Sequence, residues 1–172
     1  MQSTENAPNP APLPVHAVPY LPPAEAWQLV LQNGAQTLTL DVGAVAALSH
    51  VDLVDTLTCL EGWSAGPLHW HGIPLSALLD AVGGPAVGWI AVSAPDFRSV
   101  IPLDELPETA MLADALDGRP LPREHGGPLR LVVPGAVCYR SVKWVQCIEL
   151  RDSPAGDTAQ ARALARLKAE QP

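Results

Sequence analysis

Cys59 stands where a run of strand-forming residues, 54–58, gives way to a loop. It is followed by Glu61, Gly62 and Trp63, which indicate a tight turn beside a large aromatic side chain. A thiol in this setting can present a thiolate to a soft metal ion. The alternative is that Cys59 is a small buried apolar side chain, because that is the commoner role of a free cysteine.

A second group of candidate residues combines cations, glycines and a hydroxyl within positions 125–144. The stretch runs HGGPLR, then Pro-Gly, then RSVKW. Arginine offers a planar fork to a phosphate, lysine a point charge, and glycine-rich loops let backbone N–H groups approach an anion. The pattern therefore suits an anion, with His125, Arg130, Ser141 and Lys143 as the candidate side chains. The other interpretation is that the cations are solvated strand ends and the glycines form turns.

Two further patterns carry weaker signals. His69 and His71 would share one face of an extended segment, as two zinc ligands require, but no third ligand is evident nearby. Asp96, in the sequence PDF, has the typical position of a turn residue. The chain contains no nucleophile elbow, Walker loop or dinucleotide fingerprint.

Composition excludes several classes of protein. The chain has 172 residues, with 10 Lys and Arg against 18 Asp and Glu, so its formal charge of −8 argues against a nucleic-acid or anionic-membrane partner. Apolar residues make up 48 % and charged residues 16 %, a balance that fills a core and is unlike that of a disordered chain. This length and composition favour one folded domain.

Three cysteines without a C-x-x-C pair indicate neither a disulfide framework nor a four-thiolate zinc site. The N-terminus has no export signal, and no apolar run approaches the roughly 20 residues that span a bilayer. We therefore expect a soluble, cytoplasmic protein.

The elements that position the candidates are mostly short strands. We expect residues 1–24, with seven prolines, to form an extended lead-in that can lie along the body. A domain then covers 25–152, and a helical tail covers 153–172. Within the domain we expect a hairpin around Asn33-Gly34, a short helix capped by Asp41, and a helix near 75–82. We expect strands near 54–58, 87–94, 97–100, 126–135 and 145–150, a loop over 64–74, and helical turns over 103–118. Strands that outnumber helices without regular alternation indicate a mixed α+β fold.

Five sequence words, taken in order, resemble the molybdopterin-binding oxidoreductase domain of the sulfite oxidase family, in its compact bacterial form. They are TLTCLEGW, WHGIPLSALL, APDFRSVIPL, LDGRPLPREHGGPLRLVVPG and RSVKWVQCIEL, and the likeness runs roughly from Trp27 to Arg151. The resemblance implies a strand-rich sulfite-oxidase-like fold with molybdopterin as its cofactor. It implies that Cys59 is the molybdenum ligand. The residues it places at the cofactor are His125, Arg130, Ser141, Val142, Lys143 and Asp96.

The resemblance further implies an oxidoreductase that transfers an oxygen atom to or from a small substrate, with an electron-transfer partner. Cys138 stands where family members commonly have glycine, and LEGW lacks the arginines that follow the cysteine in the sulfite-oxidising branch. Sulfite is therefore not the substrate we expect. Because residues 1–26 contain no arginine, a second hypothesis remains: a domain of the same fold that binds no cofactor and serves as a binding or partner module.

Overall fold

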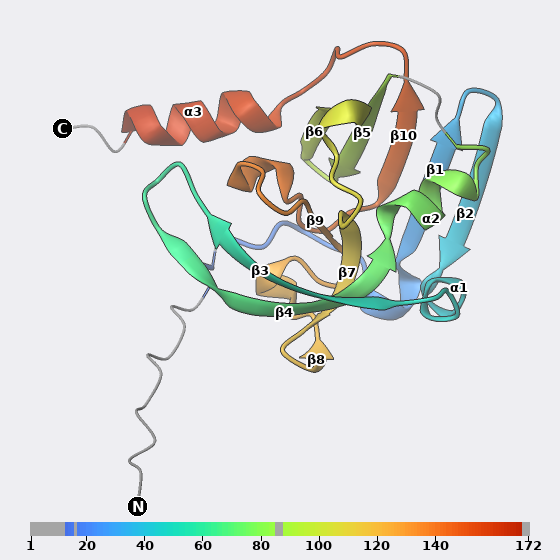
Figure 1. Ribbon diagram of the computed structural model, residues 1–172, viewed down its shortest axis with the longest axis horizontal. Helices are drawn as coiled ribbons and strands as arrows, with labels where there is room; N and C mark the ends of the chain where they lie inside the picture. The colour runs from blue at the N-terminus through green and yellow to red at the C-terminus, as the bar shows by residue number, and fades with distance from the viewer. Residues whose placement is uncertain (1–12, 16, 85–87, 170–172) are drawn as a thin grey trace, which may run out of the picture.

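The computed structural model describes residues 13–15, 17–84 and 88–169, which fold into two sheets with short helices between and around them (Figure 1). The first sheet has five strands, in which β1 pairs in parallel with β10 and the other pairs are antiparallel. In spatial order its strands are β2 (Gln36–Asp41), β1 (Gln28–Asn33), β10 (Cys147–Arg151), β5 (Trp89–Ala94) and β6 (Phe97–Pro102).

The second sheet is antiparallel and is built around the long hairpin of β3 and β4. Strand β7 pairs with β4 on one edge and with β8 and β9 on the other. The members are β3 (Val51–Thr58), β4 (Ser64–Pro74), β7 (Met111–Leu116), β8 (Arg119–Pro120) and β9 (Arg130–Val132).

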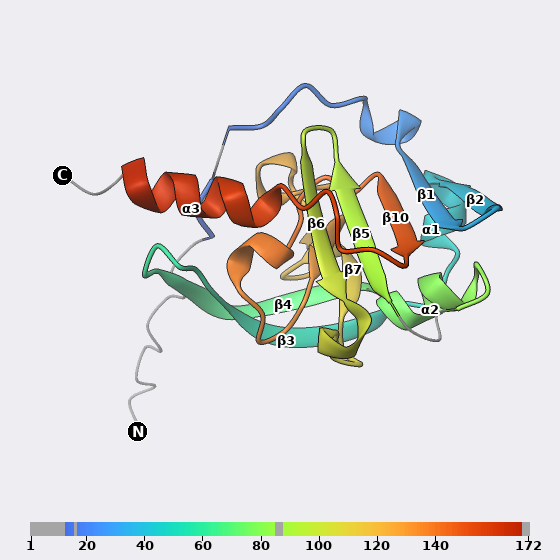
Figure 2. The ribbon, with the colours of Figure 1, turned by 90° about the horizontal axis from the view of Figure 1, so that it is seen from above.

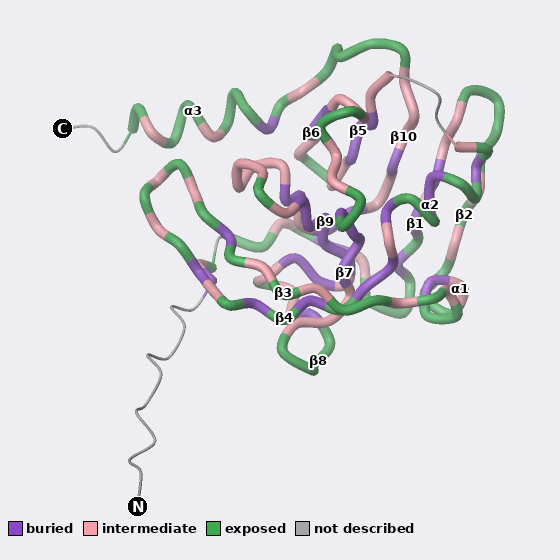
Figure 3. Tube along the Cα trace, in the orientation of Figure 1, coloured by how far each residue is buried: buried purple, intermediate pink, exposed green. Residues whose placement is uncertain are grey.

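The main core lies where the two sheets face each other. Leu29, Leu31 and Ile148 of the first sheet and Leu112 and Leu131 of the second belong to one buried cluster. Figure 3 shows this as buried stretches of β1, β5, β7, β9 and β10 that lie toward the middle of the molecule. A packed two-layer core of this kind holds the loops at its ends in fixed positions.

Three α-helices and four single turns of 3-10 helix lie between and beside the strands in the described residues. Helix α1 (Val42–Ala46) begins at Asp41, whose Oδ1 accepts a hydrogen bond of 2.8 Å from the Ala44 N–H, as expected for a capping aspartate. The others are α2 (Leu75–Asp80), α3 (Ala159–Ala169), η1 (Ala24–Ala26), η2 (Leu103–Glu105), η3 (Arg123–His125) and η4 (Cys138–Arg140). Within the described part of the chain, none of the helices has the length and apolar character needed to cross a bilayer.

The α+β prediction is confirmed, and so are the first hairpin, the helix capped by Asp41 and the strand that ends just before Cys59. The hairpin turns one residue later than expected, because Asn33 is the last residue of β1 and its side chain donates to the Val82 carbonyl at 2.9 Å.

Two segment predictions are wrong. Residues 64–74 form strand β4, where we expected a loop, because Leu68, Trp70 and Gly72 are buried in the alternating pattern of a half-buried strand despite the turn-forming residues around them. Within 103–118, a single 3-10 turn (η2) is followed by strand β7, where we expected helical turns. Strand β7 has partners on both edges, and its first three residues are buried, so pairing with distant segments overrides a local helical pattern.

The described part of the lead-in packs on the body. Leu13 joins a second buried cluster with Leu57 and Trp70, and Leu21 joins the main core. In Figure 2 this segment crosses the molecule above the sheets before it reaches β1. Residues 1–12 of the lead-in and 170–172 of the tail lie outside the described residues, and the division at 24 and 152 stays a prediction.

Candidate functional site

A pocket of about 340 Å³ lies at the end of the molecule where the β3–β4 turn meets α3, and both views show these two elements at the same end (Figures 1 and 2). This volume falls in the range of ligand sites in proteins. Five segments line it: part of the lead-in, the turn after β3, the β5–β6 turn, the 130–144 stretch and α3. The predicted site residues among its lining are Cys59, Asp96, Arg130, Ser141 and Lys143.

Cys59 is held by a tight turn at the end of β3. Its N–H donates to the Trp63 carbonyl at 2.9 Å, and its own carbonyl accepts from the Gly62 N–H at 3.0 Å. Gly62 has a φ of 90°, a conformation that glycine adopts without strain. Burial, followed by a hydrogen bond to the Cys138 thiol, raises the pKa of Cys59 to about 11. The turn thus fixes a protonated, partly buried thiol at the pocket wall.

Arg130 begins β9 and is almost completely buried. Its Nη1 donates to the His125 carbonyl at 2.9 Å, and its guanidinium lies 5.4 Å from the centre of the Trp70 ring. Its Nε is buried and has no hydrogen-bond partner within the described residues. Burial lowers the pKa of Arg130 to about 10, and no carboxylate among the described residues forms an ion pair with it. A buried cation without an anionic partner indicates that an anion from outside the chain belongs here.

Lys143 lies where its own segment of backbone passes close to Gly126. Its Nζ donates to the Glu124 carbonyl at 3.0 Å and lies 5.6 Å from the Trp144 ring centre. A Cβ on Gly126 would meet the Lys143 side chain at 2.9 Å, so only glycine leaves room for this lysine. Burial, followed by the charges of Arg130 and Arg166, lowers the pKa of Lys143 to about 8. The cation is therefore unfavourably placed until an anion joins it.

Three other predicted residues differ in how they relate to the pocket. Ser141 is buried, lines the pocket and is fixed by its N–H, which donates to the Cys138 carbonyl at 3.0 Å. Val142 packs in the main core and does not line the pocket. His125 is not among the lining residues either, and its carbonyl holds Arg130. Burial and the Lys143 charge lower the pKa of His125, so its ring is neutral at pH 7.

Asp96 lies in the β5–β6 turn, as expected for a turn residue, and also lines the pocket. Its Oδ2 is 3.3 Å from Nη1 of Arg162, a residue of α3. The sequence predicted helix α3 but gave it no role. Ala159, Arg162, Ala163, Arg166 and Leu167 of α3 line the pocket, and their spacing, which repeats at three and four residues, is the signal that could have revealed this face.

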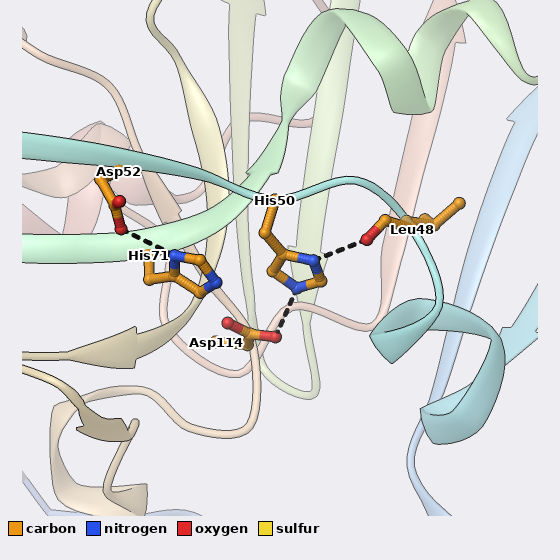
Figure 4. A network of polar contacts seen from close by, with 5 residues as sticks. All are labelled: Leu48, His50, Asp52, His71 and Asp114. Carbon is orange, nitrogen blue, oxygen red and sulfur yellow. Dashed lines mark hydrogen bonds and ion pairs between the residues drawn. The ribbon is translucent and has the colours of Figure 1, made fainter.

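The two histidines that suggested zinc lie elsewhere. The Nδ1 of His71 is 2.7 Å from Asp52, and its ring stacks on His50 at 5.0 Å (Figure 4). His50 Nδ1 is 2.7 Å from the Leu48 carbonyl, and its Nε2 is 2.8 Å from Asp114. In the part of the chain that the structure describes, no three metal-ligating side chains converge, so nothing joins His69 and His71 into a zinc site.

The pocket fits a ligand with a metal at one point and an anionic group at another. A thiol from the β3–β4 turn supplies a soft donor once it loses its proton. Arg130, with its unpartnered Nε, and Lys143 supply positive charge for the anionic part. A molybdopterin cofactor has both features, a metal and a phosphate group, so the residues present fit it.

Comparison with known proteins agrees with a molybdopterin cofactor. The oxidoreductase molybdopterin-binding domain family matches residues 15–159. The chain is 30 % identical over 136 residues to the uncharacterized oxidoreductase YuiH of Bacillus subtilis, covering 77 % of this chain and 69 % of that protein. It is 31 % identical over 134 residues to the protein-methionine-sulfoxide reductase catalytic subunit MsrP of Xanthomonas campestris, covering 67 % of this chain and 40 % of that protein.

Among solved structures, the sulfane dehydrogenase SoxCD from Paracoccus pantotrophus superimposes with a TM-score of 0.71 at 23 % identity, over 79 % of this chain and 41 % of that one. This likeness concerns the fold. The resemblance to the sulfite oxidase family is therefore confirmed, and the chain belongs to the oxidoreductase molybdopterin-binding domain family.

Proposed function

We propose that this domain holds a molybdenum cofactor with Cys59 as the metal ligand and catalyses oxygen-atom transfer to or from a small substrate. The observation that carries the proposal is that Cys59 lines the same pocket as Arg130 and Lys143, which lie far from it in the sequence. When bound, the cofactor supplies two-electron redox chemistry at molybdenum together with transfer of an oxygen atom.

In this proposal Cys59 is a metal ligand and not a nucleophile. Its thiol is protonated at neutral pH, so it must release one proton when it ligates the metal. The backbone hydrogen bonds of the turn hold the sulfur in place, which lowers the ordering cost of ligation. Trp63, which follows the turn, adds an aromatic side chain to the lining of the pocket.

Arg130, Ser141 and Lys143 hold the cofactor's phosphate group in this proposal. Arg130 can donate through its unpartnered Nε, Lys143 supplies a charge, and the Ser141 hydroxyl supplies a further hydrogen bond. His125 acts through Arg130, because its carbonyl orients the guanidinium, and Val142 contributes packing beneath the site. Asp96 acts through its contact with Arg162.

Relatives support the reaction class. Beyond the methionine-sulfoxide reductase subunit, they include a nitrate reductase of Fusarium oxysporum at 29 % identity and the mitochondrial sulfite oxidase of Drosophila melanogaster at 26 % identity. The chain spans 15 % and 29 % of those two proteins, so substrate and partners are part of the proposal. A two-electron cycle at the metal calls for an electron-transfer partner. We also place the domain in the cytoplasm, where its three free cysteines stay reduced.

Metal and pterin analysis tests the proposal. The full chain is produced in a host that makes the cofactor, and molybdenum and pterin are measured per chain. We expect near-stoichiometric amounts of both, and loss of most of the molybdenum in Cys59→Ser, because an alkoxide is a poor replacement for a thiolate. Cys147→Ser is the matched control, since Cys147 lies on β10 and is not among the residues that line the pocket. Wild-type protein free of both metal and pterin would refute the proposal and favour the cofactor-free binding module.

A further inference from the structure

Helix α3 is attached to the body at its first turn by several hydrogen bonds. Asp157 accepts from the Val100 N–H at 2.8 Å and from the Gln160 N–H at 3.1 Å. The Thr158 N–H donates to the Arg98 carbonyl at 2.9 Å, and the Thr158 hydroxyl accepts from the Arg98 N–H at 2.9 Å. These bonds tie the start of α3 to strand β6, so the direction in which the helix leaves the sheet is determined.

One face of α3 forms a wall of the pocket. Ala159 is completely buried, and Ala163 and Leu167 follow on the same stripe and are half-buried. The small side chains allow the helix to lie close to the pocket, and Arg162 and Arg166 lie on the same stripe, one turn apart. Both arginines line the pocket while remaining exposed to solvent, which places them at its mouth.

Charge is distributed very unevenly between the pocket and the rest of the chain. Four of the ten Lys and Arg residues line it, against two of the eighteen Asp and Glu residues. The two carboxylates are already engaged, Glu61 by the Trp63 indole N–H at 3.1 Å and Asp96 by Arg162. Arg130, Lys143 and Arg166 therefore face the cavity with no carboxylate of the described residues within ion-pair distance. Such a concentration of one sign of charge attracts an anion.

We propose that Arg166 of α3 is an anion-binding residue of this pocket, which completes with Lys143 and Arg130 a three-cation cradle for a phosphate-type anion. Arg166 and Lys143 line the same pocket, and the charge of Arg166 is among the causes that lower the pKa of Lys143. Helix α3 then closes the cradle from the solvent side, while Arg130 lies at its buried end. The proposal deepens the proposed function, because it concerns the same pocket, and it assigns to the C-terminal helix a role in retaining the ligand.

Phosphate binding to the cofactor-free full chain tests this directly. Inorganic phosphate is titrated while backbone amide shifts of residues 141–144 are followed by nuclear magnetic resonance. We expect Arg166→Gln to weaken binding about three- to tenfold, as fits the loss of one partly screened charge contact. Arg166→Lys, which keeps the charge, should restore most of the affinity. Lys168→Gln is the matched control, because Lys168 lies on the same turn of α3 but does not line the pocket.

A second measurement identifies the source of the anion. In protein purified with cofactor, pterin per chain is followed during dialysis for the wild type and for Arg166→Gln. Faster pterin loss from the variant assigns the cradle to the cofactor's phosphate. Unchanged pterin retention, with weaker phosphate binding to the cofactor-loaded variant, assigns it to an anionic substrate.

Equal behaviour of Arg166→Gln and Lys168→Gln in both measurements would overturn the inference. Failure of the proposed function has a different signature, since protein without molybdenum or pterin can still show phosphate binding that depends on Arg166. A melting temperature for each variant shows that the helix remains folded, because Arg166 is exposed and its replacement removes no core contact.

Discussion

Replacing Arg130 with methionine should make the cofactor-free protein more stable. Burial lowers the pKa of Arg130 to about 10, and the difference from the ordinary value of an arginine corresponds to a cost of about 3 kcal/mol for keeping the charge inside. The substitution also loses the hydrogen bond to the His125 carbonyl, worth about 1 kcal/mol, and the contact with the Trp70 ring, worth about 1 kcal/mol. The expected net gain is about 1 kcal/mol.

Urea unfolding of the cofactor-free chain, with fluorescence and circular dichroism as probes, measures this gain. A rise of about 2–4 °C in melting temperature should accompany it for a chain of this size. Arg119→Met is the matched control, since Arg119 lies exposed on the two-residue strand β8 and its change should leave stability within about 0.5 kcal/mol.

Added phosphate should make wild type more stable than Arg130→Met. A ligand that binds only the folded state stabilises it more as its concentration exceeds the dissociation constant, so wild type gains stability with phosphate while Arg130→Met gains little. If Arg130→Met is less stable than wild type by more than 1 kcal/mol without phosphate, then the buried cation is a structural member of the fold and the reasoning about an external anion fails.

Three further predictions concern single contacts. The pKa of Lys143 in the folded chain is about 8, below that of an unfolded lysine. The unfolding free energy of wild type should therefore rise relative to that of Lys143→Met between pH 8 and pH 10. A constant difference between the two proteins in urea titrations would contradict this. Burial alone would lower the pKa of His50, but Asp114 and the Leu48 carbonyl raise it overall. Wild type should therefore lose stability relative to Asp114→Asn as the pH rises from 6 to 8. Melting temperatures that change equally with pH in the two proteins would contradict this. Gly126→Ala should cost about 1–3 kcal/mol and weaken phosphate binding, because the residue has a φ of 108° and its new methyl group would displace Lys143; unchanged phosphate shifts would show that Lys143 tolerates the displacement.

The wall of the pocket that carries Cys59 could be predicted from local sequence. Strand-forming residues up to Thr58 and the Glu61-Gly62 turn define a strand end within a few positions, and that signal does not depend on distant contacts. The clustering of Arg130 and Lys143 could also be predicted from local sequence, because few residues separate them. Their convergence with Cys59 was implied by the family resemblance and is seen in the pocket lining.

Strand β7 shows what local sequence could not predict. Its sequence MLADAL has good helix formers and leucines at helical spacing, so intrinsic preference favours a helix. It is a strand because it pairs with β4 and β9. These partners come from other parts of the sequence, so a local pattern does not reveal them. Strand β4 was missed for a related reason: Gly66, Pro67 and Gly72 suggest loop, yet Gly72 lies where a Cβ would be 2.3 Å from the Leu112 carbonyl oxygen, so the close crossing with β7 requires glycine.

Helix α3 carries pocket residues that lie beyond the family match. The match to the family covers residues 15–159 and so includes Cys59, Arg130 and Lys143, whereas Arg162 and Arg166 follow it. The buried end of the pocket therefore lies within the family match, whereas the two arginines at its mouth lie beyond it. Because the cations at the buried end destabilise the folded chain until an anion binds, a helix that adds charge at the mouth strengthens retention without adding another buried charge.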